Sequence, residues 1–249
     1  MDVIVFKIVM IIIFLAMILV NYLSNALPLN NRNTGDISDS YPSYFTPPGF
    51  VFSIWGIIYV LLGIVVGKIM FTNSVVFFDQ YSITFLLLFF ITCMTNMLWL
   101  FLWHYDKLFF SVMVMIIFLV TLGWITFFLS GLDILTQIAF SVYTGWISIA
   151  LIANVTALLV KANFPLFQDK KKLWYMVMMV AGVVIGLLVL LITKNIFFIL
   201  VYIWAYFGIF MKHLKKKSYY LEKNLNVFNG VLLGVLVISA MITFAYKLL

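Results

Sequence analysis

Charged residues are scarce in this 249-residue sequence, where Asp, Glu, Lys and Arg together make up 9%. Soluble domains carry about 25% charged residues, so a water-soluble globular protein is excluded. Hydrophobic residues make up 66% and occur in long runs, without the alternation over about ten residues that a membrane β-barrel shows. Because a helix satisfies its own backbone hydrogen bonds where lipid offers none, the sequence predicts an all-α integral membrane protein with several spans.

Cysteine and histidine are also rare. The single cysteine, Cys93, lies within an apolar run, which excludes a disulfide framework or a thiolate metal cluster. His104 and His213 lie at the ends of apolar runs without a second ligand at suitable spacing, so we interpret both as interfacial residues and predict no metal site. No Asp, Glu, Arg or His lies in the interior of a run, which disfavours an ion-coupled carrier.

Eight apolar runs are candidates for membrane spans, and most contain the roughly 20 residues needed to cross the hydrocarbon. We predict spans at Val3–Asn25, Gly49–Met70, Tyr81–Trp103, Leu108–Ser130, Ile138–Val160, Leu173–Thr193, Ile196–Met211 and Asn226–Tyr246. The seventh is short, so the sixth and seventh could instead form a re-entrant hairpin. The first resembles a cleavable signal only loosely, because Asp2 offsets Lys7, and we predict a retained helix.

Positive charge is divided unequally between the two sets of loops. The formal net charge is +7, but the basic residues lie at span ends and in loops, so we predict no nucleic-acid partner. The odd-numbered loops hold Arg32, Lys107, Lys161, Lys170, Lys171, Lys172, Lys212, Lys215, Lys216, Lys217 and Lys223, and the other face holds Lys7, Lys68, Lys194 and Lys247. The positive-inside rule therefore predicts cytoplasmic odd loops. We expect a multi-pass protein of a bacterial cell membrane. The run Lys212–Lys217 is interpreted as an orientation signal, with contact to anionic lipid as the alternative.

The longest polar segment, Pro28–Pro48, separates the first two predicted spans. A loop of this length in a compact bundle is usually functional or disordered. Pro47 and Pro48 cannot continue a preceding helix but suit a first helical turn, so they fix the start of the second span. We predict a lid over a pocket, with Phe45, Pro47 and Pro48 as its lid residues.

Aromatic and amide residues recur at helical spacing on three predicted spans. The second span carries Phe52, Trp55 and Tyr59, the third carries Asn96, Trp99 and Trp103, and the fifth carries Tyr143, Trp146, Ala150 and Asn154. Each set lies along one face of its helix.

An aromatic belt at the membrane interface explains Trp103 but not Trp146, which lies about 12 Å inside its predicted span. Asn96 and Asn154 would have unpaired donors and acceptors if they faced lipid, so we predict that these faces point inward. They describe a mostly apolar pocket for a flat hydrophobic ligand, beneath the predicted lid. Helix packing alone is the alternative.

Three pairs of glycines lie four residues apart, a spacing that lets helix backbones approach closely. The pairs are Gly63/Gly67, Gly182/Gly186 and Gly230/Gly234. Packing within the chain is the first interpretation, and a homodimer is the alternative.

The segment Pro42–Tyr59, PSYFTPPGFVFSIWGIIY, resembles the pattern KPSWTPPxxVFxxVWxxLY of the TspO/MBR family of tryptophan-rich sensory proteins. Phe45 stands where the family has a tryptophan. Thr95–Trp99 is similar to the family's LNxxW, and Val142–Asn154 is similar to its PYxxWxxxAxxxN-like stretch. The match at the second span is specific, whereas the other two would be weak alone.

This resemblance covers residues 1–161 and implies a TspO-like five-helix transmembrane bundle, whose loop 28–48 caps a pocket for a porphyrin, another tetrapyrrole or a sterol. Residues 162–249 would form a membrane extension of about three more helices. The resemblance implies that Trp55, Asn96, Trp99, Trp146 and Asn154 bind the ligand. The predicted ligand-binding residues are those of the three faces except Trp103: Phe52, Trp55, Tyr59, Asn96, Trp99, Tyr143, Trp146, Ala150 and Asn154.

Three functions follow from the same residues. The first is a tetrapyrrole-binding protein of the bilayer with a sensory or regulatory role and no required cofactor. The second is a porphyrin-degrading enzyme, with Trp55 and Trp146 as the candidate catalytic indoles. The third is a transporter of a hydrophobic small molecule.

Overall fold

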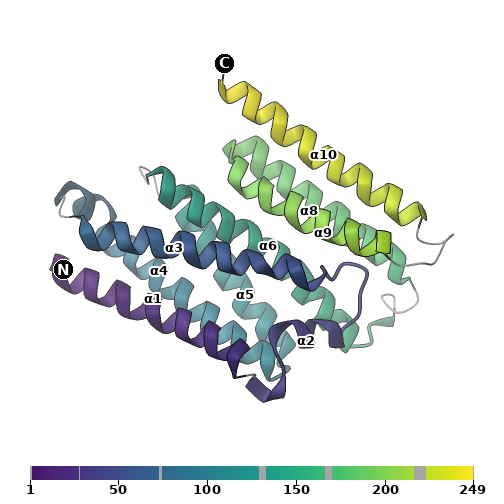
Figure 1. Cartoon of the computed structure of the whole chain (residues 1–249), viewed down its shortest axis with the longest axis horizontal. Coiled ribbons are helices and arrows are strands. Elements are labelled where there is room, and N and C mark those ends of the chain that lie inside the picture. Colours follow the sequence, from purple (N-terminus) through teal and green to yellow (C-terminus); the bar gives the residue numbers. More distant parts are fainter. Residues whose placement is uncertain are drawn as a thin grey trace. The chain divides into compact units, whose positions relative to one another are not determined.

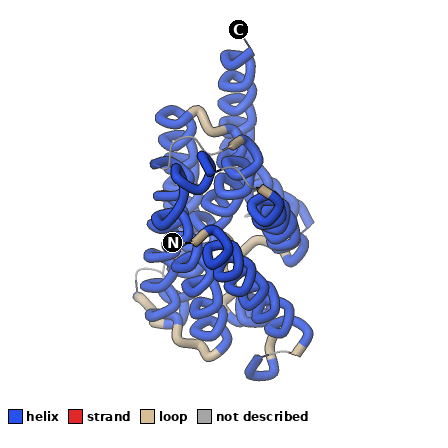
Figure 2. Tube along the Cα trace, turned by 90° about the vertical axis from the view of Figure 1, so that its left-hand side faces the viewer, coloured by secondary structure: helices blue, strands red, loops and turns tan. Residues whose placement is uncertain are grey.

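The structure is a computed structural model that describes residues 2–27, 29–72, 75–128, 133–165, 170–215 and 223–248. In this part of the chain every regular element is a helix (Figure 2). The elements, labelled in Figure 1, are α1 (Val3–Ala26), η1 (Leu29–Asn31), α2 (Thr34–Ser40), η2 (Gly49–Ser53), α3 (Ile54–Phe71), α4 (Val75–His104), α5 (Leu108–Gly123), η3 (Trp124–Phe128), α6 (Ile134–Lys161), α8 (Lys171–Thr193), α9 (Ile196–Lys215) and α10 (Lys223–Leu248).

The prediction of an all-α protein with eight spans is confirmed. Eight of the described helices are long and apolar enough to cross a membrane, and their order matches the predicted runs. The seventh differs in length, because α9 continues past Met211 to Lys215 and reaches 20 residues, or about 30 Å at 1.5 Å per residue. The sequence prediction ended it at the first lysine, but Lys212 and His213 stay helical and bond to backbone carbonyls elsewhere in the chain.

Contacts divide the chain into two compact units. The first consists of Met1–Ile37 and Trp55–Ile147, and the second of Ser38–Ile54 and Ser148–Leu249. The segment before α3 is thus grouped with the C-terminal helices, although it precedes them by about a hundred residues. The division at residue 161 that the family resemblance implied stays a prediction.

Within the first unit, α4 packs against both α1 and α5. Hydrogen bonds also join α1 to the C-terminal end of α3. Lys7 Nζ donates to the carbonyls of Met70 (2.9 Å) and Thr72 (2.7 Å), which satisfies the open C-terminus of α3.

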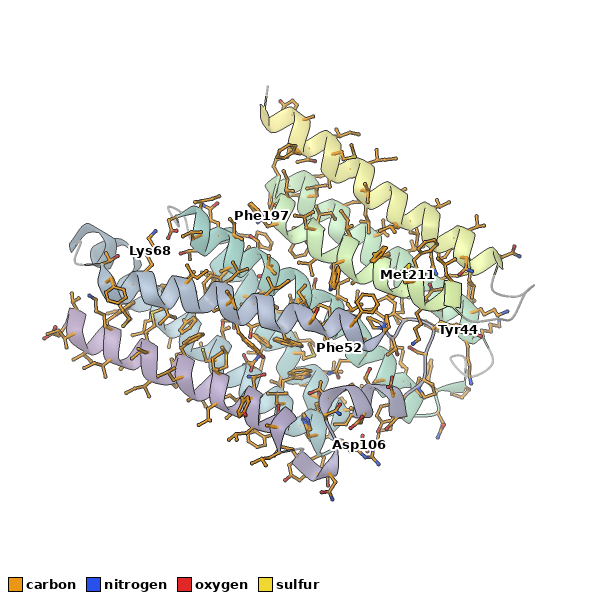
Figure 3. All side chains as sticks on the ribbon, viewed as in Figure 1. Tyr44, Phe52, Lys68, Asp106, Phe197 and Met211 are labelled. Atoms are coloured by element: carbon orange, nitrogen blue, oxygen red, sulfur yellow. The ribbon has the colours of Figure 1, made fainter. Side chains whose placement is uncertain are left out.

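An ion pair lies at this same end of α3. Lys68, labelled in Figure 3, pairs with Asp133 at 3.0 Å, just before α6. Asp133 also accepts hydrogen bonds from Leu135 N and Thr136, as an N-cap does. Burial alone would raise the pKa of Asp133, but the hydrogen bonds from Thr136 and Lys68 outweigh it, and the pKa lies below its ordinary value.

Within the second unit, α8, α9 and α10 lie side by side (Figure 1). Gly182 and Gly186 on α8 face α9. A Cβ atom at Gly182 would collide with the Tyr206 hydroxyl, and one at Gly186 would crowd Ile199 and Tyr202. Tyr206 donates to the carbonyl of Met179 at 2.6 Å. This glycine pair therefore serves packing within the chain, as the first interpretation expected.

The start of the second span follows the prolines, as predicted, but not directly as an α-helix. Pro48 is extended (φ −70°, ψ 157°), and a 3₁₀ turn over Gly49–Ser53 precedes α3. Val51 N donates to the Pro48 carbonyl at 3.0 Å. The carbonyls of Thr46 and Val51, on either side of the prolines, accept from side chains of α9 instead.

Candidate functional site

Four aromatic rings from α3 and α4 form one stack in the first unit. The Trp55 ring lies 5.6 Å from that of Tyr59 and 5.7 Å from that of Trp99, with interplanar angles of 24° and 23°. Trp99 continues the stack to Trp103 at 6.3 Å and 29°. Each helix contributes two residues four apart, which the helical repeat places on one face. We call these four residues, Tyr59, Trp55, Trp99 and Trp103, the aromatic stack.

Helix α6 adds two rings that meet the stack edge-on. Tyr143 lies 6.0 Å from Trp55 at 77°, and Trp146 lies 6.2 Å from it at 86°. Such edge-to-face contacts place the positive ring edge against the negative ring face. The tryptophans predicted to converge from three spans thus meet at Trp55.

A chain of side-chain hydrogen bonds runs beside these rings and joins four helices. Tyr59 Oη donates to Asn21 Oδ1 (2.5 Å), Asn21 Nδ2 donates to Asn96 Oδ1 (2.6 Å), and Asn96 Nδ2 donates to Tyr143 Oη (2.9 Å). Asn21 Nδ2 also reaches the Met17 carbonyl at 2.8 Å. Asn96 is completely buried, so its predicted inward direction is confirmed. These bonds remove the cost of burying two amides in an apolar bundle.

Asn21 is the residue that the sequence reasoning missed. It lies in the first predicted span, and the only signal was an amide within the last turns of a mostly apolar run. Trp103 was assigned to the interfacial belt, yet its Nε1 donates to the Thr34 carbonyl of α2 at 3.2 Å and its ring ends the stack.

The stack contains a buried donor. Trp99 is 5% exposed, and its Nε1 has no hydrogen-bond partner among the described residues. The hydroxyl of Thr92, on the same helix, is also buried and also has no hydrogen-bond partner among the described residues. A buried donor without an acceptor costs about 1–3 kcal/mol, so an acceptor atom on a ligand would stabilise the site.

The remaining predicted site residues belong to the second unit. Phe52 and Ala150 are half-buried, and Asn154 is buried as predicted. The lid residues Phe45 and Pro47 are buried, and Pro48 is half-buried. Their roles as ligand contacts and as a lid stay predictions.

The segment Tyr44–Val51 is held by three side chains of α9. Trp204 Nε1 donates to the Val51 carbonyl (3.1 Å), Lys212 Nζ to the Thr46 carbonyl (2.7 Å), and His213 Nε2 faces the Tyr44 carbonyl (3.1 Å). Trp204 and Lys212 are eight residues apart, two turns along one face. Gly208 lies midway between them and packs against Pro48 and Val51.

His213 is fixed from its other side as well. Its Nδ1 lies 2.8 Å from Asn229 Nδ2, and Asn229 Oδ1 accepts from the hydroxyl of Tyr175. Because the amide nitrogen can only donate, Nδ1 is an acceptor and Nε2 carries the proton toward Tyr44. His213 is thus an uncharged connection between α9, α10 and the Tyr44–Val51 segment.

His104 is also buried, although the sequence placed it at the interface. Its Nδ1 lies 2.7 Å from the Leu100 carbonyl, and its own carbonyl accepts from Asn30 Nδ2 at 3.1 Å. Among the described residues no three His, Cys, Asp or Glu side chains gather as metal ligands would.

Comparison with known proteins places this architecture in a family. Neither a curated protein nor a solved structure matches the chain. The family model described as TSPO-like protein matches residues 7–244. That range extends from the first candidate span into the last and includes the three C-terminal helices, about which the motif resemblance implied nothing. The chain therefore belongs to the TSPO-like protein family.

Proposed function

We propose that this membrane protein binds a flat hydrophobic ligand, a porphyrin or related tetrapyrrole, against the aromatic stack, and that it has a sensory or regulatory role. The observation that carries the proposal is the stack itself, with the buried Trp99 Nε1 as a donor. Aromatic faces with few polar groups suit a planar, largely apolar molecule.

The spacing of the rings limits how the ligand can bind. A planar molecule between two rings needs about 7 Å, twice the carbon contact distance of about 3.5 Å. Trp55 and Trp99 are 5.7 Å apart, so the ligand lies against the stack rather than between these two rings. Trp55 and Tyr59 are only half-buried, whereas Trp99 and Trp103 are buried. We therefore expect the ligand to reach the stack, and the Trp99 Nε1 donor, from the side of Trp55 and Tyr59.

Porphyrin oxidation at the same indoles is the second candidate function. Trp55 contacts Trp99, Trp146, Tyr143 and Tyr59 directly, and adjoining aromatic rings can share an unpaired electron. In this function Trp55 and Trp146 would be the redox-active residues.

Titration of the purified protein with protoporphyrin IX, followed by quenching of tryptophan fluorescence, tests the binding function. We expect saturation in the low micromolar range, a binding free energy of about −8 kcal/mol. Trp99→Phe keeps an aromatic ring but removes the N–H donor, and should weaken binding about tenfold. Trp55→Ala should weaken it further.

Trp124→Phe is the matched control, because Trp124 is exposed and lies outside the stack. Equal affinities for the Trp55, Trp99 and Trp124 variants would contradict the proposal. Loss of light-driven porphyrin bleaching in Trp55→Phe, with binding retained, would support the enzyme.

A further inference from the structure

A cavity of about 240 Å³ lies within the second unit, and none of its described lining residues belongs to the aromatic stack. One wall is the backbone segment Pro42–Phe45, and the others come from α6, α8 and α9. The side chains that the argument below uses are Tyr44, Lys171, Trp174, Tyr175, Lys212 and His213. The cavity is smaller than the roughly 300–1,000 Å³ of pockets for drug-sized ligands, so it suits a small group.

The charged side chains that line this cavity are basic. Lys171 and Lys212 both line it, and none of the described lining residues is acidic. The hydrogen bond from Lys212 Nζ to the Thr46 carbonyl fixes the ammonium group at the wall. His213 uses both ring nitrogens in the contacts described above and adds no charge. Two lysines among the described lining residues, with no acidic residue beside them, favour an anion.

The start of α8 adds to this positive environment. The helix begins at Lys171, and its N-cap residue, Lys170, forms no side-chain cap. Lys170 thus offers no side-chain acceptor to the first N–H groups of the helix, and the helix dipole places partial positive charge at this end. Lys171, the first residue of this helix, also lines the cavity.

Several residues that line the cavity lie at the ends of candidate spans, where lipid head groups would be expected. Lys171 is the first residue of its candidate span, and Lys212 and His213 lie in the last turn of theirs. Trp174 and Tyr175 are residue types that favour this level. The rings of Tyr44 and Tyr175 are 5.8 Å apart, and that of Tyr44 lies 6.0 Å from His213. Figure 3 shows Tyr44 near the end of α9 that carries Met211.

We propose that this cavity binds a phosphate group, with Lys171 and Lys212 as its cationic contacts. Basic pockets between spanning helices near the cytoplasmic surface are typical sites for anionic lipid head groups. The phosphate can come from the head group of a lipid such as phosphatidylglycerol or from a soluble phosphate ester. A bound phosphate would also bridge α8 and α9 beside the Tyr44–Val51 segment.

Native mass spectrometry of the full-length protein in micelles with phosphatidylglycerol and phosphatidylcholine tests the proposal. We expect the wild type to retain phosphatidylglycerol preferentially. Lys171→Gln and Lys212→Gln should each weaken this retention about fivefold, which corresponds to about 1 kcal/mol per lysine near a membrane surface. The double variant Lys107→Gln/Lys161→Gln is the control, because it loses two lysine charges outside the cavity, one more than either single variant, and should still retain the lipid.

Two further arms complete the test. Millimolar glycerol phosphate that displaces the bound lipid identifies a soluble phosphate as a ligand, and resistance to displacement identifies the lipid.

If Lys212→Gln unfolds because Thr46 loses its donor, Lys171→Gln alone carries the test, since it leaves that bond in place. Retention in Lys171→Gln equal to that of the control pair, or equal retention of both lipids by the wild type, would overturn the proposal. The outcome is independent of porphyrin binding, which is measured on different residues.

Discussion

Asn21 and Asn96 show how single polar side chains specify an apolar bundle. Leu, Ile and Phe can pack in several registers, but an amide has donors and acceptors at fixed positions. The hydrogen bonds from Asn21 to Asn96 and from Asn96 to Tyr143 close only when α1, α4 and α6 are aligned as they are. The two amides therefore fix the helix positions beside the aromatic stack.

Substitution of Asn96 tests this role. Asn96→Leu should leave the Asn21 amide and the Tyr143 hydroxyl with fewer partners, and should lower the stability of the protein by about 1–3 kcal/mol. Thr95→Val is the control on the adjacent residue, because the Thr95 hydroxyl bonds only to carbonyls of its own helix. Thermal unfolding in detergent measures both. Equal unfolding temperatures for the two variants would refute a specifying role for Asn96.

At the scale of elements, α9 combines two tasks. One face packs on α8 through Tyr202 and Tyr206. A second holds the Tyr44–Val51 segment through Trp204 and Lys212, with Gly208 between them. The prolines of that segment cannot extend a helix or donate N–H groups, so its conformation depends on α9.

Gly208→Ala tests the close approach of α9 to this segment. The added Cβ would overlap Val51 Cγ2, and a β-branched side chain has little freedom to move away. We expect a loss of about 1–3 kcal/mol in stability, measured by thermal unfolding, and partial recovery when Val51→Ala is added. Gly234→Ala on α10 is the control: its Cβ would meet nothing within 4 Å, so this change should be neutral or stabilising by up to about 1 kcal/mol. A stable Gly208→Ala protein would show that the contact is not tight.

At the scale of the whole molecule, the excess of lysine in the odd loops sets the expected orientation, with those loops in the cytoplasm. Single cysteines can test it, because the native Cys93 is completely buried. Lys107→Cys lies in an odd loop and Lys194→Cys in an even one, and both positions are exposed. A membrane-impermeant maleimide added to intact bacterial cells should label position 194 at once and position 107 only after the membrane is opened. The reverse pattern would invert the topology.

The sequence predicted the parts of this structure that depend on short-range physics. Long apolar runs identified the eight spans, and residues four apart on one helix predicted the pairs Trp55/Tyr59 and Trp99/Trp103. The contacts of Asn21 depend on which helices become neighbours. The spacing of residues along one sequence does not reveal which helices these are. The grouping of Ser38–Ile54 with the C-terminal helices was missed for the same reason. Its donors, Trp204 and Lys212, resemble ordinary interfacial residues in the sequence.

The hydrogen bonds of Asn21 and Lys7 also bear on processing of the N-terminus. A signal peptidase that cut after Ala26 would remove both side chains. Tyr59 Oη and Asn96 Oδ1 would lose their partner, and the final carbonyls of α3 would lose the ammonium group that satisfies them. We therefore expect a chain shortened at this point to be less stable than one that keeps α1.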